Sequence, residues 1–181
     1  MKSPLKELFD RLRPVRGPRD RMGLRGIVIA ELRDSEGRLK QREVTHNLVT
    51  DQGDKFAAAA IYTAAYSTWG MKLGTDDTAA AKNSTGSFIA AGNYVSGSAK
   101  ALDDSTPKVG ASPNITQFRR LWAAGEATSD GIAEVGIVDN TTDAGEPDAA
   151  HTFARAVFAA AINKAAADTL TVTWNVTFEG T

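Results

Sequence analysis

The sequence of 181 residues predicts a mainly β protein, an antiparallel β-sandwich of jelly-roll-like character with one packed α-helix. Residues 168–179 alternate apolar and polar side chains without interruption. Further runs of strand-forming residues recur at short spacing and are separated by turn residues. Only the stretch after residue 50 combines an N-cap residue with a long helical spacing of apolar side chains.

The alternating segment is the strongest single prediction, because side chains on a strand point to opposite faces in turn. Thr and Asn fill the odd positions from 169 to 177. Burial of the five apolar side chains contributes on the order of 10 kcal/mol before conformational entropy is subtracted. We therefore expect a central core strand formed by Leu170, Val172, Trp174, Val176 and Phe178.

Residues 1–23 are predicted to form a basic N-terminal arm, separate from a single sandwich domain over 24–181. Residues 1–25 carry eight Lys or Arg against three acids, about +5, so the remainder of this chain of net charge -1 is about -6. Ser3 and Pro4 favour the start of a short amphipathic helix within the arm, and Pro14 and Pro18 favour an extended continuation. A disordered tail is the alternative. The expected interface residues are the apolar anchors Leu5, Leu8, Phe9 and Leu12 and the cations Arg11, Arg13, Arg16, Arg19 and Arg21.

The sandwich is predicted to begin with a β-hairpin, residues 24–33 and 38–46, around a type I turn at Asp34–Gly37. The second strand of this hairpin is strongly charged, so it is expected at a sheet edge or on a solvated face. A helix should follow, capped by Thr50 or Asp51 and packed through Phe56 and nearby alanines. Residues 69–75 are predicted to form a short strand that ends at a glycine turn.

Residues 76–112 differ in composition, since small, polar and turn-forming residues surround a modest apolar group. A loop of this length inside a domain is usually functional or part of an interface, so we expect a projecting excursion. Strands return at 115–124, 131–138 and 152–162, the last with residues 154, 156, 158, 160 and 162 on one face. An acidic loop at 139–148 separates the final two of these strands.

No catalytic, metal or cofactor site can be assembled from the sequence. Cysteine is absent, and the two histidines, His46 and His151, lack metal-binding spacing. Nucleophile-elbow and phosphate-loop motifs are missing, and the acidic loop does not match a calcium loop. We therefore expect a protein that is not an enzyme and that uses no cofactor. No apolar run of about 18 residues and no signal peptide are recognised, so no membrane association is expected.

Four blocks, taken in order, resemble small virion structural proteins of tailed bacteriophages. They are THNLVTDQG at 45–53, GIAEVGIVD at 131–139, TFAR at 152–155 and DTLTVTWNVTF at 168–178. The resemblance implies a β-sandwich in a virion, assembled in the cytoplasm of the bacterial host, as a head decoration (cement) protein or a tail or fibre component. It implies no catalytic residues.

The leading hypothesis is a capsid decoration protein that stabilises the shell by clasping neighbouring subunits through the arm. Its partners would be the major capsid protein or other virion proteins, and a homo-oligomer, a dimer or trimer, is expected. A tail or baseplate adaptor or a fibre component is the alternative. Nucleic-acid binding through the arm is less favoured, because its Leu and Phe residues have helical spacing and the body is acidic. A polysaccharide hydrolase would need carboxylates that only the fold could bring together.

Overall fold

The computed structural model describes residues 22–62, 70–90, 92–103, 108–109, 114–139 and 149–180. In these residues the chain is mainly β and antiparallel with one α-helix, as predicted. The strands are β1 (Met22–Arg33), β2 (Leu39–Val49), β3 (Gly70–Gly74), β4 (Lys100–Ala101), β5 (Lys108–Val109), β6 (Ile115–Trp122), β7 (Ser129–Val138), β8 (Thr152–Lys164) and β9 (Thr169–Gly180). Helix α2 spans Asp51–Tyr62, and the 3-10 turn η1 spans Ser84–Ser87.

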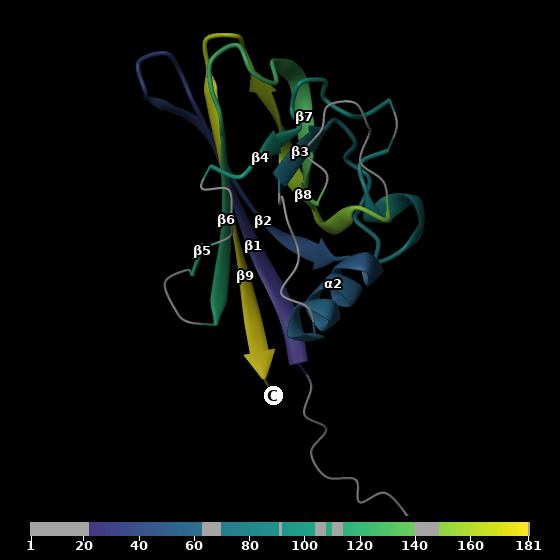
Figure 1. Ribbon diagram of the computed structural model, residues 1–181. Coiled ribbons are helices and arrows are strands. Elements are labelled where there is room, and N and C mark those ends of the chain that lie inside the picture. The colour runs from purple at the N-terminus through teal and green to yellow at the C-terminus, as the bar shows by residue number, and fades with distance from the viewer. Residues whose placement is uncertain are drawn as a thin grey trace, which may run out of the picture.

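The strands form one sheet in the order β4-β3-β7-β8-β2-β1-β9-β6-β5, and it is nearly closed into a barrel. Figure 1 shows β6, β9 and β1 along one side of the molecule and β3, β7 and β8 along the other. The two sides are continuous because β2 pairs with β1 and, at residues 47–49, also with β8. The sandwich and jelly-roll details of the prediction are not confirmed by this strand order.

Strand β9 lies inside the sheet, between β1 and β6, and its even-numbered side chains face the core. Leu170, Val172, Trp174 and Val176 are fully buried or nearly so. Phe178 departs from the prediction, because 39% of it is exposed. It pairs with Leu24, which is itself only partly buried, so the core ends before this row of the sheet.

The β1–β2 hairpin has the predicted turn. The Gly37 amide donates to the Asp34 carbonyl at 3.0 Å, and Gly37 has a φ of 81°, which favours glycine. The ladder between β2 and β8 covers only residues 47–49, so the charged part of β2, before Asn47, pairs with β1 alone and lies at an edge on its other side, as one of the two alternatives predicted. Its exposed charged residues also lie on a solvated face, where Val44 is exposed.

Thr50, rather than Asp51, caps α2, because its Oγ1 accepts a hydrogen bond from the Gly53 amide at 2.9 Å. Gly53 lets the helix approach β8 closely, since an added Cβ would lie 2.1 Å from the Phe153 carbonyl oxygen. The helix lies toward the end of the molecule where β9 ends (Figure 1). Phe56 anchors it in the core with 7% exposure.

The segment after β3 packs on the sheet instead of projecting from it, which corrects the expectation for its described part. Ile89 and Ser98 have no exposed surface, and Val95 joins the hydrophobic core. Ile89 reaches the glycines of the strands beneath, because an added Cβ on Gly74 would lie 2.6 Å from it. Small and apolar residues therefore form a flap, defined here as residues 75–98, over the outer face of β3, β7 and β8.

The expected apolar face of β8 is interrupted. Ala154, Ala156 and Phe158 are buried and Ile162 is fully buried, but Ala160 is exposed. The register between β7 and β8 shifts between Ile132 and Glu134, so the strict alternation is lost there. A single inserted residue in a strand is enough to move the following side chains to the other face.

Candidate functional site

A buried ion cluster lies beneath the flap, on the outer face of β7 and β8. Glu134 and Arg155 are 0% and 1% exposed, and the Arg155 Nε donates to Glu134 Oε2 at 2.6 Å. The strand register pairs Gly136 with Arg155 and Glu134 with Val157, so the two charged side chains are diagonal neighbours on one face. Residues Glu134, Arg155 and Asp76 are called the Glu134 cluster below.

The cluster ties the flap to the sheet. The Asp76 amide donates to Glu134 Oε1 at 3.2 Å, and the Asp76 carboxylate lies 3.7 Å from Arg155 Nη2. Arg155 Nη1 donates to the Gly86 carbonyl at 3.1 Å. These contacts join the beginning and the middle of the flap to adjacent strands. Gly74 makes room for them, since an added Cβ would lie 2.3 Å from Glu134 Oε1.

The electrostatics of the cluster are those of a buried structural pair. Burial raises the pKa of Glu134, although the hydrogen bond and charge of Arg155 oppose that shift. Hydrogen bonds from Thr78 lower the pKa of Asp76. Lys72 is fully buried on the same face, with its Nζ 5.6 Å from the centroid of the Tyr94 ring. The arrangement positions backbone segments of the flap against β7 and β8.

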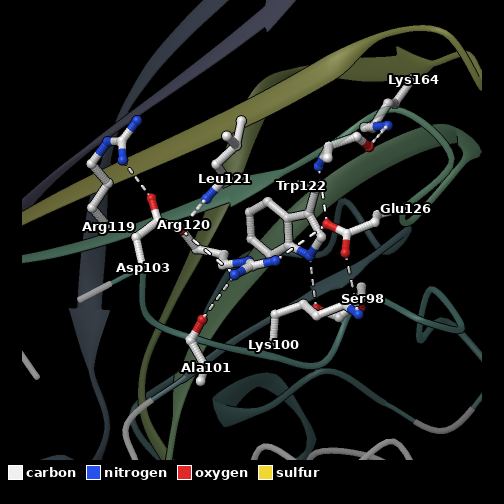
Figure 2. A network of polar contacts seen from close by, with 11 residues as sticks. Ser98, Lys100, Ala101, Asp103, Arg119, Arg120, Leu121, Trp122, Glu126 and Lys164 are labelled. Carbon is white, nitrogen blue, oxygen red and sulfur yellow. Dashed lines mark hydrogen bonds and ion pairs between the residues drawn. The ribbon is translucent and has the colours of Figure 1, made fainter. Parts of the chain in front are cut away.

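A second polar network links residues near the two ends of the sheet, and Figure 2 shows it. Residues 98–103 contain β4, which pairs with β3 at one end of the sheet. The same residues contact β6 near the other end: the Asp103 amide donates to the Arg119 carbonyl at 3.0 Å, and Asp103 Oδ1 accepts from the Leu121 amide at 2.9 Å. Trp122 Nε1 donates to the Ser98 carbonyl at 2.8 Å. We call these contacts the seam.

Charged residues reinforce the seam around Glu126. Its carboxylate accepts from the Ala123 amide at 3.0 Å and from Arg120 Nη2 at 3.2 Å, and it lies 3.4 Å from Lys100 Nζ. The hydrogen bond from Ala123 lowers the pKa of Glu126, with Lys100 and Arg120 adding to the shift. Lys164, whose pKa burial lowers, donates to the Ala123 carbonyl at 3.0 Å. Glu126, Arg120 and Lys164 each hydrogen-bond to backbone groups, as Arg155 and Glu134 do in the Glu134 cluster.

A third ion pair fixes the turn before β9, and it predicts a pH dependence of stability. Lys40 Nζ lies 2.6 Å from Asp168 Oδ2, and this hydrogen bond lowers the pKa of Asp168. Because the folded pKa lies below the unfolded value of about 3.9, the stabilisation is present above that pH. It is lost as the pH falls through the folded pKa.

Replacing Lys40→Met should therefore reduce the free energy of unfolding at pH 6 and have a smaller effect at pH 2.5. Denaturant titrations at both pH values measure the difference. Lys55→Met, on the exposed surface of α2, is the matched control and should have a small effect at both. Equal losses for Lys40→Met at the two pH values would show that the ion pair does not carry the dependence.

The structure also has two surface hollows, and neither is lined by residues of the Glu134 cluster or of the seam. The first, of about 310 Å³, lies where β1 and β2 separate and is lined by Leu24, Arg25, Gly26, His46 and Asn47. The side-chain amide of Asn47 and the Nε1 of Trp174 are buried there without a hydrogen-bond partner. The second, of about 240 Å³, is lined by Thr50, Asp51, Gln52, Lys55, Lys82, Asn83, Ser87, Ala149 and Ala150.

None of the residues expected to act in binding lies within the described residues. All nine arm residues, from Leu5 to Arg21, lie outside the described residues, as does the acidic stretch 140–148. His151 Nδ1 lies 2.7 Å from Asp139 Oδ1, and His46 lines the first hollow. Within the described ranges no group of three His, Cys, Asp or Glu side chains could hold a metal ion. No helix in that part of the chain is long and apolar enough to span a membrane.

Sequence reasoning missed the Glu134 cluster and the seam. A signal for the cluster was present, because Glu134 and Arg155 each interrupt an otherwise apolar strand with opposite charge. Two such strands adjacent in a sheet favour an ion pair. Nothing local marked the seam, since Ser98 and Asp103 belong to a polar, turn-rich segment whose packing depends on the tertiary fold.

The described residues define a nearly closed antiparallel β-barrel whose buried charges contact backbone groups and one another. Comparison with protein-family models, with curated proteins and with solved structures gave no match.

Proposed function

We propose that this chain is a non-catalytic structural protein of a tailed-phage virion, a capsid decoration protein that stabilises the shell by clasping neighbouring subunits. The proposal rests first on the ordered sequence blocks that resemble such proteins. In it, the arm binds the neighbouring subunit or the major capsid protein, and the barrel is a rigid body that carries the arm. The sandwich of the sequence prediction then corresponds to the two sides of the one sheet, which face each other across the core.

The observation that supports this role best is how the described charged residues are used. Glu134, Arg155 and Asp103 bind backbone or one another in the flap and the seam. Such networks fix a single arrangement of the polypeptide. A rigid body of this kind suits a protein that acts by binding many equivalent positions on a shell, where each bound copy stabilises the assembled state by mass action.

A tail or baseplate adaptor, or a fibre component, is the second candidate within the same class. The same rigid barrel and basic arm would suit an adaptor. A low-resolution map of the particle, with the barrel located on head or tail, separates the two.

Removal of residues 1–21, which precede β1, should leave a folded barrel that no longer binds shells. The expected result follows because β1 begins at Met22, so the sheet is untouched while the basic, apolar arm is lost. Cosedimentation with shells purified from the encoding phage measures binding, and circular dichroism checks the fold. Decoration at the wild-type level by the shortened chain would reject the clasping role of the arm.

A further inference from the structure

One side of β1 is open at the end of the molecule where the arm begins. The ladder between β1 and β2 starts at the pair Ile27 and His46, whereas β1 pairs with β9 from Met22 onward. Beyond His46, β2 diverges and pairs with β8 at residues 47–49. Within the described ranges, the residues of β1 before Ile27 therefore have a ladder partner on the β9 side alone. These residues, 22–26, are called the open edge below.

The larger of the two surface hollows, about 310 Å³, lies along the open edge. Leu24, Arg25 and Gly26 line it from β1, and His46 and Asn47 line it from β2. It thus fills the gap that opens where the two strands diverge. Backbone donors and acceptors recur along a strand edge at the spacing of another extended chain, so the occupant that matches this gap is an extended polypeptide.

Two polar side chains at the inner end of the hollow have no hydrogen-bond partner in the described part of the chain. They are the amide of Asn47 and the Nε1 of Trp174, a residue without exposed surface. Both border Gly26, because an added Cβ there would collide with Asn47 Oδ1 and would lie 2.8 Å from Trp174 Nε1. Buried polar groups without partners cost free energy. A polypeptide backbone supplies both a donor for Oδ1 and an acceptor for Nε1.

Apolar surface is uncovered at the same end of the barrel. Phe178 is 39% exposed, and Leu24, its partner across the β1–β9 ladder, is only partly buried. The even-numbered residues of β9 face the core, so Phe178 continues the core row beyond the part that the described residues cover. An occupant of the open edge that also carries apolar side chains would bury this row.

The arm has the position and the composition that this occupant requires. It is the chain directly before Met22, so it leaves the barrel beside the open edge. Residues 14–21 are predicted to be extended, and they are longer than the five residues of the open edge. Pro14 and Pro18 are four residues apart, so their missing amides lie on one edge of an extended strand and the other edge keeps its donors. Residues 5, 8, 9 and 12 supply the apolar side chains.

A neighbouring copy can supply this segment without a change of chain direction. To pair with its own open edge the arm would have to reverse directly before Met22, where Asp20 and Arg21 stand in place of the glycine that tight hairpin turns favour. Between two copies the arm simply continues β1. Residues 14–21 of each copy then lie antiparallel to residues 22–26 of the other, which gives a closed dimer with two-fold symmetry.

We infer that the open edge and its hollow are the receptor for the arm of a second copy of this chain. The inference rests on the proposed function, in which the arm clasps a neighbouring subunit, and it identifies that subunit. Each arm adds a strand to the partner's sheet, provides backbone groups for Asn47 and Trp174, and covers Leu24 and Phe178. Both copies give and receive an arm, so the two contacts reinforce one another.

Sedimentation equilibrium of the full-length chain, without shells, tests the inference. The wild-type chain should form dimers, and removal of residues 1–21 should give monomers. Asn47→Leu removes the unpaired amide at similar volume, so it should weaken dimerisation by about tenfold or more. Asn175→Leu makes the same change at an amide that already accepts a hydrogen bond from Gln117, so it should alter dimerisation by less than about twofold.

Stability measurements separate this binding role from a structural one. At concentrations where the wild-type chain is monomeric, Asn47→Leu should leave the midpoint of denaturant unfolding unchanged or raise it, because the lost amide has no partner there. A lowered midpoint would show that Asn47 supports the fold, and it would overturn the role assigned to the hollow. Hydrogen exchange gives a second readout. Amides of the open edge that do not pair with β9 should exchange more slowly in the dimer than in the monomer.

Each contrary result has a distinct meaning. A wild-type chain that stays monomeric at millimolar concentration, or a dimer that survives removal of residues 1–21, would overturn the inference. Protection of the open edge that is independent of concentration but lost with the arm would assign the site to the arm of the same copy and would also overturn it. Shell binding by a monomeric chain would leave the proposed function standing. A dimer with the expected variant behaviour that fails to bind shells would reject the shell role and support the receptor.

Discussion

Arg155→Met is expected to lower the free energy of unfolding by about 3–5 kcal/mol, because it leaves Glu134 buried without a compensating charge. Arg155 and Glu134 are 1% and 0% exposed and 2.6 Å apart, so water cannot replace the lost partner without opening the flap. The hydrogen bond to Gly86 is lost as well. Denaturant titration at pH 7 measures the change.

The double variant Arg155→Met with Glu134→Leu separates the pair from the packing. It removes both charges, so it should recover most of the lost stability, as a buried ion pair replaced by apolar residues often does. Arg38→Met is the matched control, since Arg38 forms ion pairs with Asp34 and Glu36 but is 71% exposed. It should cost less than about 1 kcal/mol. Similar losses for Arg155→Met and Arg38→Met would refute the structural role of the cluster.

Trp122→Ala is expected to lower the free energy of unfolding by about 3–5 kcal/mol, because it both creates a cavity in the core and breaks the seam. Trp122 has no exposed surface, and its Nε1 donates to the Ser98 carbonyl. Trp122→Phe retains most of the ring volume but removes the donor, so it leaves a buried carbonyl unpaired. Trp122→Phe should therefore lower the free energy of unfolding by about 1–3 kcal/mol.

Hydrogen exchange distinguishes these two losses. Trp122→Phe should increase exchange at the Asp103 and Leu121 amides, which the seam protects, more than at β1 amides that pair with β9. Uniform acceleration throughout the sheet would instead show that the seam does not open as a local unit.

The sequence allowed the local elements to be predicted where one physical cause dominated. The alternation from Leu170 to Val176 predicted a buried strand, and Asp34 with Gly37 predicted the hairpin turn. Phe178 follows the same alternation yet is exposed, because the depth of the core at that row depends on partners from β1 rather than on β9 itself. Periodicity identifies a face but not how far the core extends along it.

The candidate sites required information that spacing along the chain does not contain. The sequence of the flap predicts a solvated loop. In the structure the flap is buried, because Gly74 and Gly136 on adjacent strands leave room for Ile89. The Glu134 cluster combines residues from β7, β8 and the flap, so its geometry follows from the register and the β-bulge.

The pairing of β1 with β9 determines when, during synthesis, the sheet can be completed. Met22 pairs with Gly180 and Arg33 with Thr169, so β1, which pairs early with β2, finds its second neighbour only after β9 has been synthesised. Contacts this distant in sequence slow folding, and on the ribosome they delay it until β9 leaves the exit tunnel. Strand β9 also lies between β1 and β6, so a nascent or prematurely terminated chain that lacks β9 cannot join these two strands in one sheet.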